Sequence, residues 1–149
     1  MSWRDAAVWG ALALALCSGL AGLFGLVRWY LALPSRGFWI GARVAQALAV
    51  AYAALAGVVF LAGARPASSL YWLYALLPIA IGFVAEQLRL VAADHVLATR
   101  ELDDAQELAR LPRAEQEAIV LAIVRREMVI MALAAVVVCF LALRAAGTY

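Results

Sequence analysis

Long apolar runs alternate with short polar breaks along this chain. Four of the runs are long enough to cross a bilayer, which takes a helix of about 20 residues. They lie at about 6–30, 39–64, 69–90 and 122–145. Turn-forming residues separate the first three runs, at Pro34–Gly37 and Gly63–Ser68. The pattern predicts an all-α membrane protein, a four-transmembrane-helix up-and-down bundle that forms the single domain 1–149.

Residues 86–127 form the one strongly charged segment, with nine acids, six arginines and the only histidine. In its first half, apolar positions recur by three and four, as in a coiled-coil seam. These positions are Leu88, Val91, His95, Ala98, Leu102, Ala105 and Ala109. The spacing resumes after Leu111-Pro112, where proline interrupts the helix, at Leu121, Val124, Met128, Met131, Ala135 and Val138. We therefore expect the third and fourth helices to extend from the membrane as an antiparallel hairpin paired along this seam.

Arginines are distributed unevenly between the two ends of the expected spans. All twelve basic residues are arginine. Nine lie in the hairpin or around the first connection, namely Arg28, Arg36, Arg43, Arg89, Arg100, Arg110, Arg113, Arg125 and Arg126. Only Arg4, Arg65 and Arg144 lie on the other side. Because arginine-rich connections stay in the cytoplasm, we expect a multi-pass protein of the cell membrane with a cytoplasmic hairpin and both termini outside.

Small residues recur on two of the expected spans. They are Gly19, Gly22 and Gly25 in the first span, and Ala45, Ala49, Ala53 and Gly57 in the second. Small residues let helices approach closely in a membrane. We expect these faces to mediate helix association, including a homo-oligomer or contact with a membrane protein partner. The net charge of +2, with no basic cluster interleaved with aromatics, gives no support to nucleic acid as a partner.

Four polar residues lie near the inner ends of the expected spans: Gln46, Glu86, Arg89 and Glu127. Glu86 and Arg89 are three residues apart, so on a helix they share a face and can pair. Ionisable groups inside a membrane are costly and commonly functional, which makes Glu86 a candidate proton or cation site. The alternative is that these long side chains lie at the interface and extend into the headgroups. For Gln46 we expect an interhelical hydrogen bond, with a ligand contact as the alternative.

His95 and Met128 are the candidate cofactor ligands. Folding the hairpin at Leu111-Pro112 sets His95 roughly opposite Glu127 and Met128, and histidine with methionine can hold a haem b. The alternative is a seam histidine that pairs with Glu127 or with Asp94. We expect no cofactor, because the chain holds only one histidine.

Motifs of catalysis and metal binding are missing from the sequence. We find no nucleophile elbow, phosphate loop, HExxH or paired catalytic carboxylates, and so predict neither catalytic residues nor a metal site. Cys17 and Cys139 lie alone in apolar runs, without the spacing of a metal or redox motif.

The second and third spans resemble part of a known family. They carry Arg43-Val44-Ala45-Gln46, the small residues up to Gly57, and Leu70-Tyr71-Trp72 leading to Pro78. This stretch is similar to one four-helix half of the haem A synthase type and to b-type cytochrome four-helix bundles. The whole chain also resembles uncharacterised bacterial four-span membrane proteins. The resemblance implies a four-helix bundle; the haem-ligating histidines of those families are absent from the first three spans.

Three functional hypotheses follow. The leading one is a non-enzymatic membrane protein that associates through its helix faces and presents the cytoplasmic hairpin to a partner. The alternative is a small transporter or channel that uses Glu86, Arg89 and Gln46 along a polar track. The third is a redox subunit that binds haem or quinone through His95.

Overall fold

The computed structural model describes residues 2–99 and 105–149. These residues form five helices and no strand. The helices are α1 (Trp3–Tyr30), α2 (Arg36–Leu61), α3 (Leu70–Thr99), α4 (Ala105–Arg110) and α5 (Arg113–Thr148). All except α4 are long and apolar enough to cross a membrane. The prediction of an all-α chain with four candidate membrane spans is therefore confirmed.

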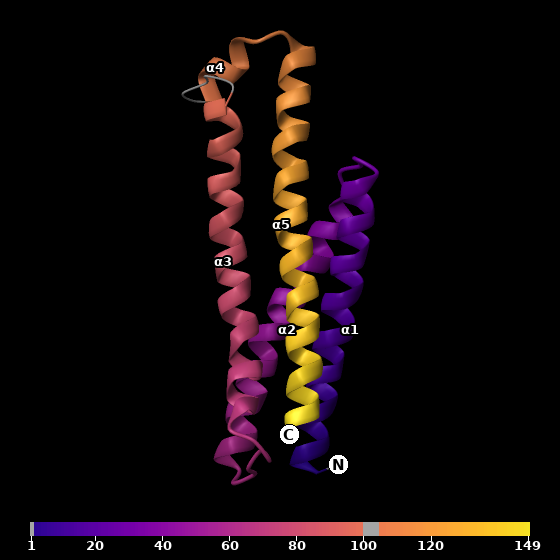
Figure 1. Ribbon diagram of the computed structural model, residues 1–149, viewed down its shortest axis with the longest axis vertical. Coiled ribbons are helices and arrows are strands. Elements are labelled where there is room, and N and C mark those ends of the chain that lie inside the picture. Colours follow the sequence, from indigo (N-terminus) through magenta and orange to yellow (C-terminus); the bar gives the residue numbers. More distant parts are fainter. Residues whose placement is uncertain (1, 100–104) are drawn as a thin grey trace.

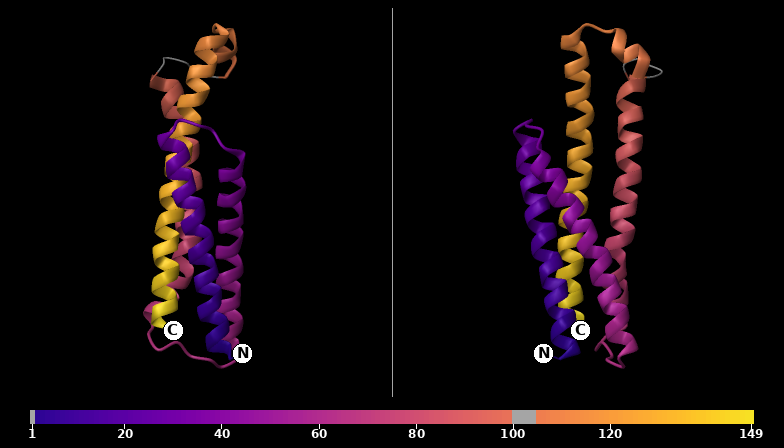
Figure 2. Two further views of the ribbon diagram at one scale, coloured as in Figure 1. Left: turned by 90° about the vertical axis from the view of Figure 1, so that its right-hand side faces the viewer. Right: turned by 180° about the vertical axis from the view of Figure 1, so that it is seen from behind.

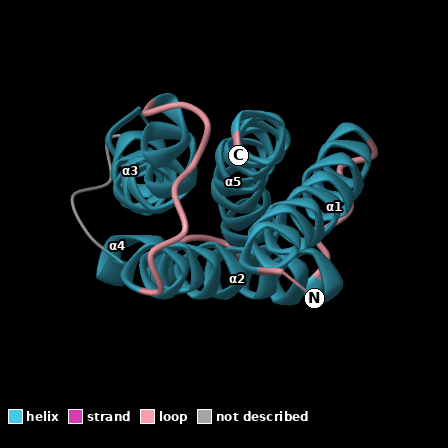
Figure 3. Cartoon of the chain, turned by 90° about the horizontal axis from the view of Figure 1, so that it is seen from below, coloured by secondary structure: helices cyan, strands magenta, loops and turns pink. Residues whose placement is uncertain are grey.

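The four long helices are arranged as a row of three with one helix across it. Seen from below, α3, α5 and α1 stand in a row, and α2 lies across one face of that row (Figure 3). From behind, α2 runs obliquely from the far end of α1 toward the start of α3 (Figure 2). Helix α5 packs extensively against both α1 and α3, whereas α2 contacts α1 much more than α3. The loose packing between α2 and α3 matters for the site described below.

The two ends of the molecule differ. Both termini lie at one end, and the connection through α4 lies at the other, where α3 and α5 extend beyond the connection between α1 and α2 (Figure 1). Local sequence signals set the helix ends: the Ser35 hydroxyl accepts a hydrogen bond from the Phe38 N–H at 3.3 Å, and such a cap begins a helix well. Pro112 immediately precedes α5, and Gly63, with a φ of 87°, follows α2.

The glycines of α1 bring that helix against α5. A Cβ on Gly22 would lie 2.7 Å from Val136 Cγ2 and 3.0 Å from the Ala132 carbonyl oxygen. Glycine is thus required for this approach, as expected for small residues between membrane helices. On α2, Ala45 and Ala49 are buried. A Cβ atom added to Gly57 would have no neighbouring atom within 4 Å. The expected contact faces are therefore used largely within the chain.

The expected seam of the hairpin is displaced by one residue on α3. Leu88 and Val91 are 51% and 61% exposed, and His95 is exposed as well. Ala85 and Ala92 are the buried residues of this arm. The small side chains of Ala85 and Ala92 allow α3 to approach α5 closely. Which residues of α3 face α5 therefore depends on where these alanines lie. The larger apolar side chains face outward, so the predicted register is wrong here.

On α5 four of the six expected seam positions are buried, but Met131, Ala135 and Val138 line a space shared with α1 and α2 as well as α3. Met128, Met131, Ala135 and Val138 are buried, whereas Leu121 is exposed and Ile119 takes the buried position instead. Leu102 lies outside the residues that the structure describes, as does Arg100.

Candidate functional site

Four polar side chains from α2 and α3 meet in one cluster, which we call the Glu86 cluster: Arg43, Gln46, Glu86 and Arg89. Arg43 Nη1 donates to Glu86 Oε1 at 2.6 Å and to Gln46 Oε1 at 2.8 Å. Gln46 Nε2 donates to the same Glu86 oxygen at 3.0 Å. Arg89 Nε lies 3.3 Å from Glu86 Oε2, an ion pair without hydrogen-bond angles. The Glu86 carboxylate of α3 therefore interacts with side chains of both α2 and α3.

Helical spacing explains how the cluster forms. Arg43 and Gln46 are three residues apart on α2, and Glu86 and Arg89 are three apart on α3, so each pair shares a face. The interhelical hydrogen bond expected for Gln46 is present, as is the pairing of Glu86 with Arg89. Arg43, which the sequence marked only as a topology signal, is the closest partner of Glu86. Its position three residues before Gln46 could have indicated this role.

The Glu86 cluster is partly open to its surroundings. The side chains of Glu86 and Arg89 are each 25% exposed, and that of Arg43 is 53% exposed. Arg89 Cζ lies 5.4 Å from the centre of the Trp39 ring on α2, within the range of a cation–π contact. The Glu127 carboxylate on α5 is near enough to interact electrostatically with Arg89 and Glu86. The charges of two arginines and two glutamates thus balance.

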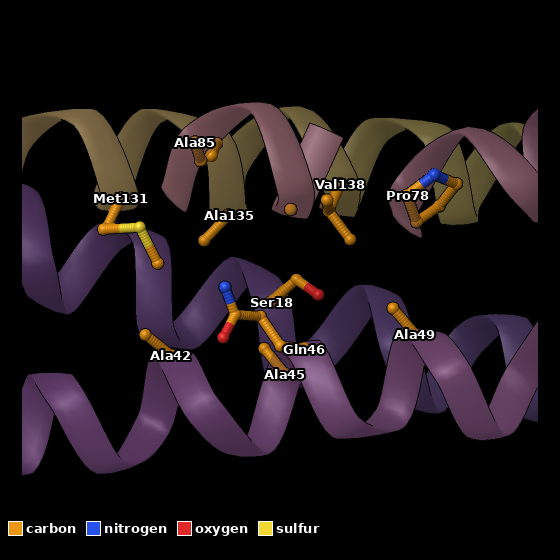
Figure 4. A pocket seen from close by; sticks show the side chains of 12 residues that line it. Ser18, Ala42, Ala45, Gln46, Ala49, Pro78, Ala85, Met131, Ala135 and Val138 are labelled. Carbon is orange, nitrogen blue, oxygen red and sulfur yellow. The ribbon is translucent and has the colours of Figure 1, made fainter. Parts of the chain in front are cut away.

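A small cavity of about 30 Å³ lies beside this cluster, between the four long helices. Figure 4 shows the Gln46 amide and the Ser18 hydroxyl among small and apolar side chains. Ser18 is fully buried, and its hydroxyl donates to the Leu14 carbonyl oxygen at 2.7 Å. Since a water needs about 10–15 Å³ of such space, the cavity has room for about two waters.

A larger groove of about 230 Å³ runs along the gap between α2 and α3. It is lined by Gln46, Ala49, Val50, Pro78, Ile79, Gly82, Phe83 and Glu86. Four of these residues also line the small cavity: Gln46, Ala49, Pro78 and Gly82. The groove exists because Gly82 and Ala49 have almost no side chain, so α2 and α3 approach without filling the space between them. We call it the α2–α3 groove.

A cluster of tyrosines lies nearer the termini. The hydroxyl oxygens of Tyr52 and Tyr71 are 3.2 Å apart, and the rings of Tyr71 and Tyr149 pack edge to face, 4.9 Å between centres. Tyr52 and Tyr71 are almost completely buried. Tyr52 was not predicted from the sequence as a buried polar residue. A tyrosine in the middle of an apolar run could have indicated this contact, because a buried tyrosine hydroxyl usually needs a hydrogen-bond partner.

The two candidate haem ligands are not brought together. Met128 is buried and packs in the cluster that contains Ala85 and Phe38, whereas His95 is exposed. Ala85 precedes His95 by ten residues on α3, which is about 15 Å along a helix. Within the described residues, no group of three or more His, Cys, Asp or Glu side chains could hold a metal ion.

Comparisons with protein-family models, with curated proteins and with solved structures find no match to this chain.

Proposed function

We propose that this protein is a non-enzymatic four-span membrane protein whose cytoplasmic hairpin binds a partner protein. In this proposal α1, α2, α3 and α5 cross the bilayer in an up-and-down arrangement. The arginine distribution places the hairpin in the cytoplasm by the positive-inside rule. The four spans hold the arms of α3 and α5 at a fixed place on the membrane surface.

An exposed apolar patch on the hairpin carries the proposal. Val120 and Leu121 are 48% and 38% exposed on α5. With Pro34, Val124, Gln116 and Glu117 they line a shallow groove of about 440 Å³. Val120 precedes the charged run Arg125–Glu127 by five residues, so it lies on the water side if that run marks the membrane edge. Apolar patches rimmed by polar residues in water commonly mark protein interaction sites.

The Glu86 cluster supports binding over transport. The Glu86 carboxylate already receives hydrogen bonds from Arg43 and Gln46 and lies against Arg89. A carboxylate that carries protons or cations must exchange its partners, and here a fixed set of partners joins α2 to α3.

Site-specific photo-crosslinking in native membranes tests the proposal. A photoreactive residue at Val120 should give one discrete protein adduct, and its mass distinguishes a second copy from a different protein. The matched control is Leu133, which is equally exposed on the same helix but within the expected span. Leu121→Glu should abolish the Val120 adduct by placing a charge in the patch. Adducts that are the same at both positions, or that persist in Leu121→Glu, would contradict the proposal.

A further inference from the structure

We propose that the α2–α3 groove binds an anionic phospholipid, with one acyl chain along the groove and the phosphate against Arg36 and Arg43. This inference does not depend on the hairpin partner. It requires that α2 and α3 cross the membrane with Arg43 at the cytoplasmic side, as in the orientation proposed above.

The groove has the shape and lining that a hydrocarbon chain needs. Apart from Gln46 and Glu86, its lining residues are apolar, and three of them, Val50, Ile79 and Phe83, are exposed at the outer surface. The groove thus opens sideways, toward the lipid of a surrounding bilayer. Its volume of about 230 Å³ exceeds the roughly 150 Å³ of an apolar cavity that takes up benzene. Within a bilayer, acyl chains are the molecules available to fill it.

The polar end of the groove offers free hydrogen-bond donors. A guanidinium has five N–H groups. Arg43 uses three of them, two on Nη1 and one on Nη2, toward Gln46 and Glu86. Two remain, and half of the side chain is exposed. Arg43 can therefore bind a phosphate oxygen without releasing Glu86.

Arg36 extends this basic surface toward the membrane edge. It precedes Arg43 by seven residues, and seven residues at 3.6 per turn place the two side chains on the same face of α2. Trp39 lies between them and contacts Arg89 of α3, so this face is the one directed at α3. Tryptophan is a typical residue of the membrane interface. Along α2, Arg36 and Arg43, which would bind the headgroup, therefore come before Gln46, Ala49 and Val50, which line the groove.

The charges favour an anionic lipid over a zwitterionic one. Arg43 and Arg89 lie at this end of the groove with the carboxylates of Glu86 and Glu127, and Arg36 precedes Arg43 on the same face of α2. The sum is one positive charge, and Arg36 has no acidic partner among the described residues. Anionic lipids are enriched at cytoplasmic membrane surfaces, where each basic residue adds to their binding. A lipid headgroup with a phosphate and no positively charged amine would neutralise this single positive charge.

Native mass spectrometry of the purified protein with phosphatidylglycerol or phosphatidylcholine tests the proposal. The wild-type protein should retain one phosphatidylglycerol in preference to phosphatidylcholine. Arg36→Gln should weaken phosphatidylglycerol binding about fivefold, the effect of one basic residue near a membrane surface. Gly82→Leu should remove binding by filling the groove, since a side chain there projects toward Gln46.

Matched variants separate the groove from general lipid adhesion. Gly57→Leu places the same side chain on α2 where no neighbouring atom lies within 4 Å, and Arg113→Gln removes an arginine from the hairpin arm. Both should bind phosphatidylglycerol like the wild type, with unchanged helix content in all variants. Equal binding of the two lipids would overturn the proposal. So would full binding by Gly82→Leu.

Discussion

Glu86 shows how one side chain can join two membrane helices. Its carboxylate accepts hydrogen bonds from Arg43 and Gln46 on α2 and pairs with Arg89 on its own helix. Removing Arg43 would leave the partly buried Glu86 carboxylate with Arg89 as its only cation, and removing Glu86 would leave both arginines without it. The loss of a hydrogen bond to a charged group costs more than that of a neutral one. The cluster therefore fixes the distance between α2 and α3, which otherwise pack loosely.

A double-mutant cycle of Arg43→Ala and Glu86→Ala measures this effect. We expect a coupling free energy of about 1 kcal/mol, because the pair is charged but only partly buried. Reversible unfolding in mixed micelles gives the free energy of unfolding for each variant. The matched control is Arg113 with Glu117, whose side chains are 92% and 69% exposed, and whose coupling should not exceed a few tenths of a kcal/mol. Equal coupling in the two cycles would refute a structural role for Glu86.

The pairing of α3 with α5 depends on small residues at the contact. Ala85 and Ala92 are buried between the arms, whereas Leu88 and Val91 face outward. Hydrophobicity is therefore a poor guide to the contact face at the membrane edge, where large apolar side chains also face lipid or headgroups. Size is the better guide, because alanine permits close approach of two helices.

Two arginine substitutions on adjacent residues distinguish the two registers. Ala92→Arg should open the hairpin, since it places a long charged side chain in a close contact, and overpacking a tight site typically costs about 1–3 kcal/mol. Val91→Arg should leave the hairpin closed, because Val91 is exposed. Limited proteolysis of the arms in detergent reports the opening. If Val91→Arg were the more sensitive variant, the register expected from the sequence would be correct and the observed one wrong.

The molecule as a whole has charged residues concentrated at the end with the hairpin. Both termini lie at the opposite end (Figure 1). Of the arginines in the described residues, those at the hairpin end and around the first connection outnumber Arg4, Arg65 and Arg144. An insertion machinery that retains arginine-rich connections would therefore leave the hairpin in the cytoplasm.

Cysteine labelling tests this orientation. Cys17 and Cys139 are free and half-buried, so Cys17→Ala with Cys139→Ala gives a background without thiols. In that background, Glu117→Cys on the hairpin should react with a membrane-impermeant reagent only in inside-out vesicles or after permeabilisation. Ser2→Cys, near the other end, should react in intact cells. Labelling of Glu117→Cys from outside would reverse the proposed orientation and place the hairpin partner on the external surface.

The sequence alone determined that the chain has four long apolar helices, but not the short helix α4. Each apolar run is long enough to satisfy its own backbone hydrogen bonds as a helix across the bilayer, and proline or glycine marks the breaks. It also indicated the close approach of α1 through Gly22, because a missing side chain is visible in the sequence. The pairing of Glu86 with Arg89 followed from a spacing of three residues within one helix.

Only the tertiary structure decided which helix faces meet. In a membrane, the side of a helix that faces lipid is as apolar as the side that faces the interior, so the hydrophobic pattern does not fix the rotation of each helix about its axis. That rotation makes Arg43 the partner of a glutamate 43 residues away, buries Ala92 in place of Val91, and leaves a groove open between α2 and α3. Packing against neighbouring helices, which no local pattern records, sets all three.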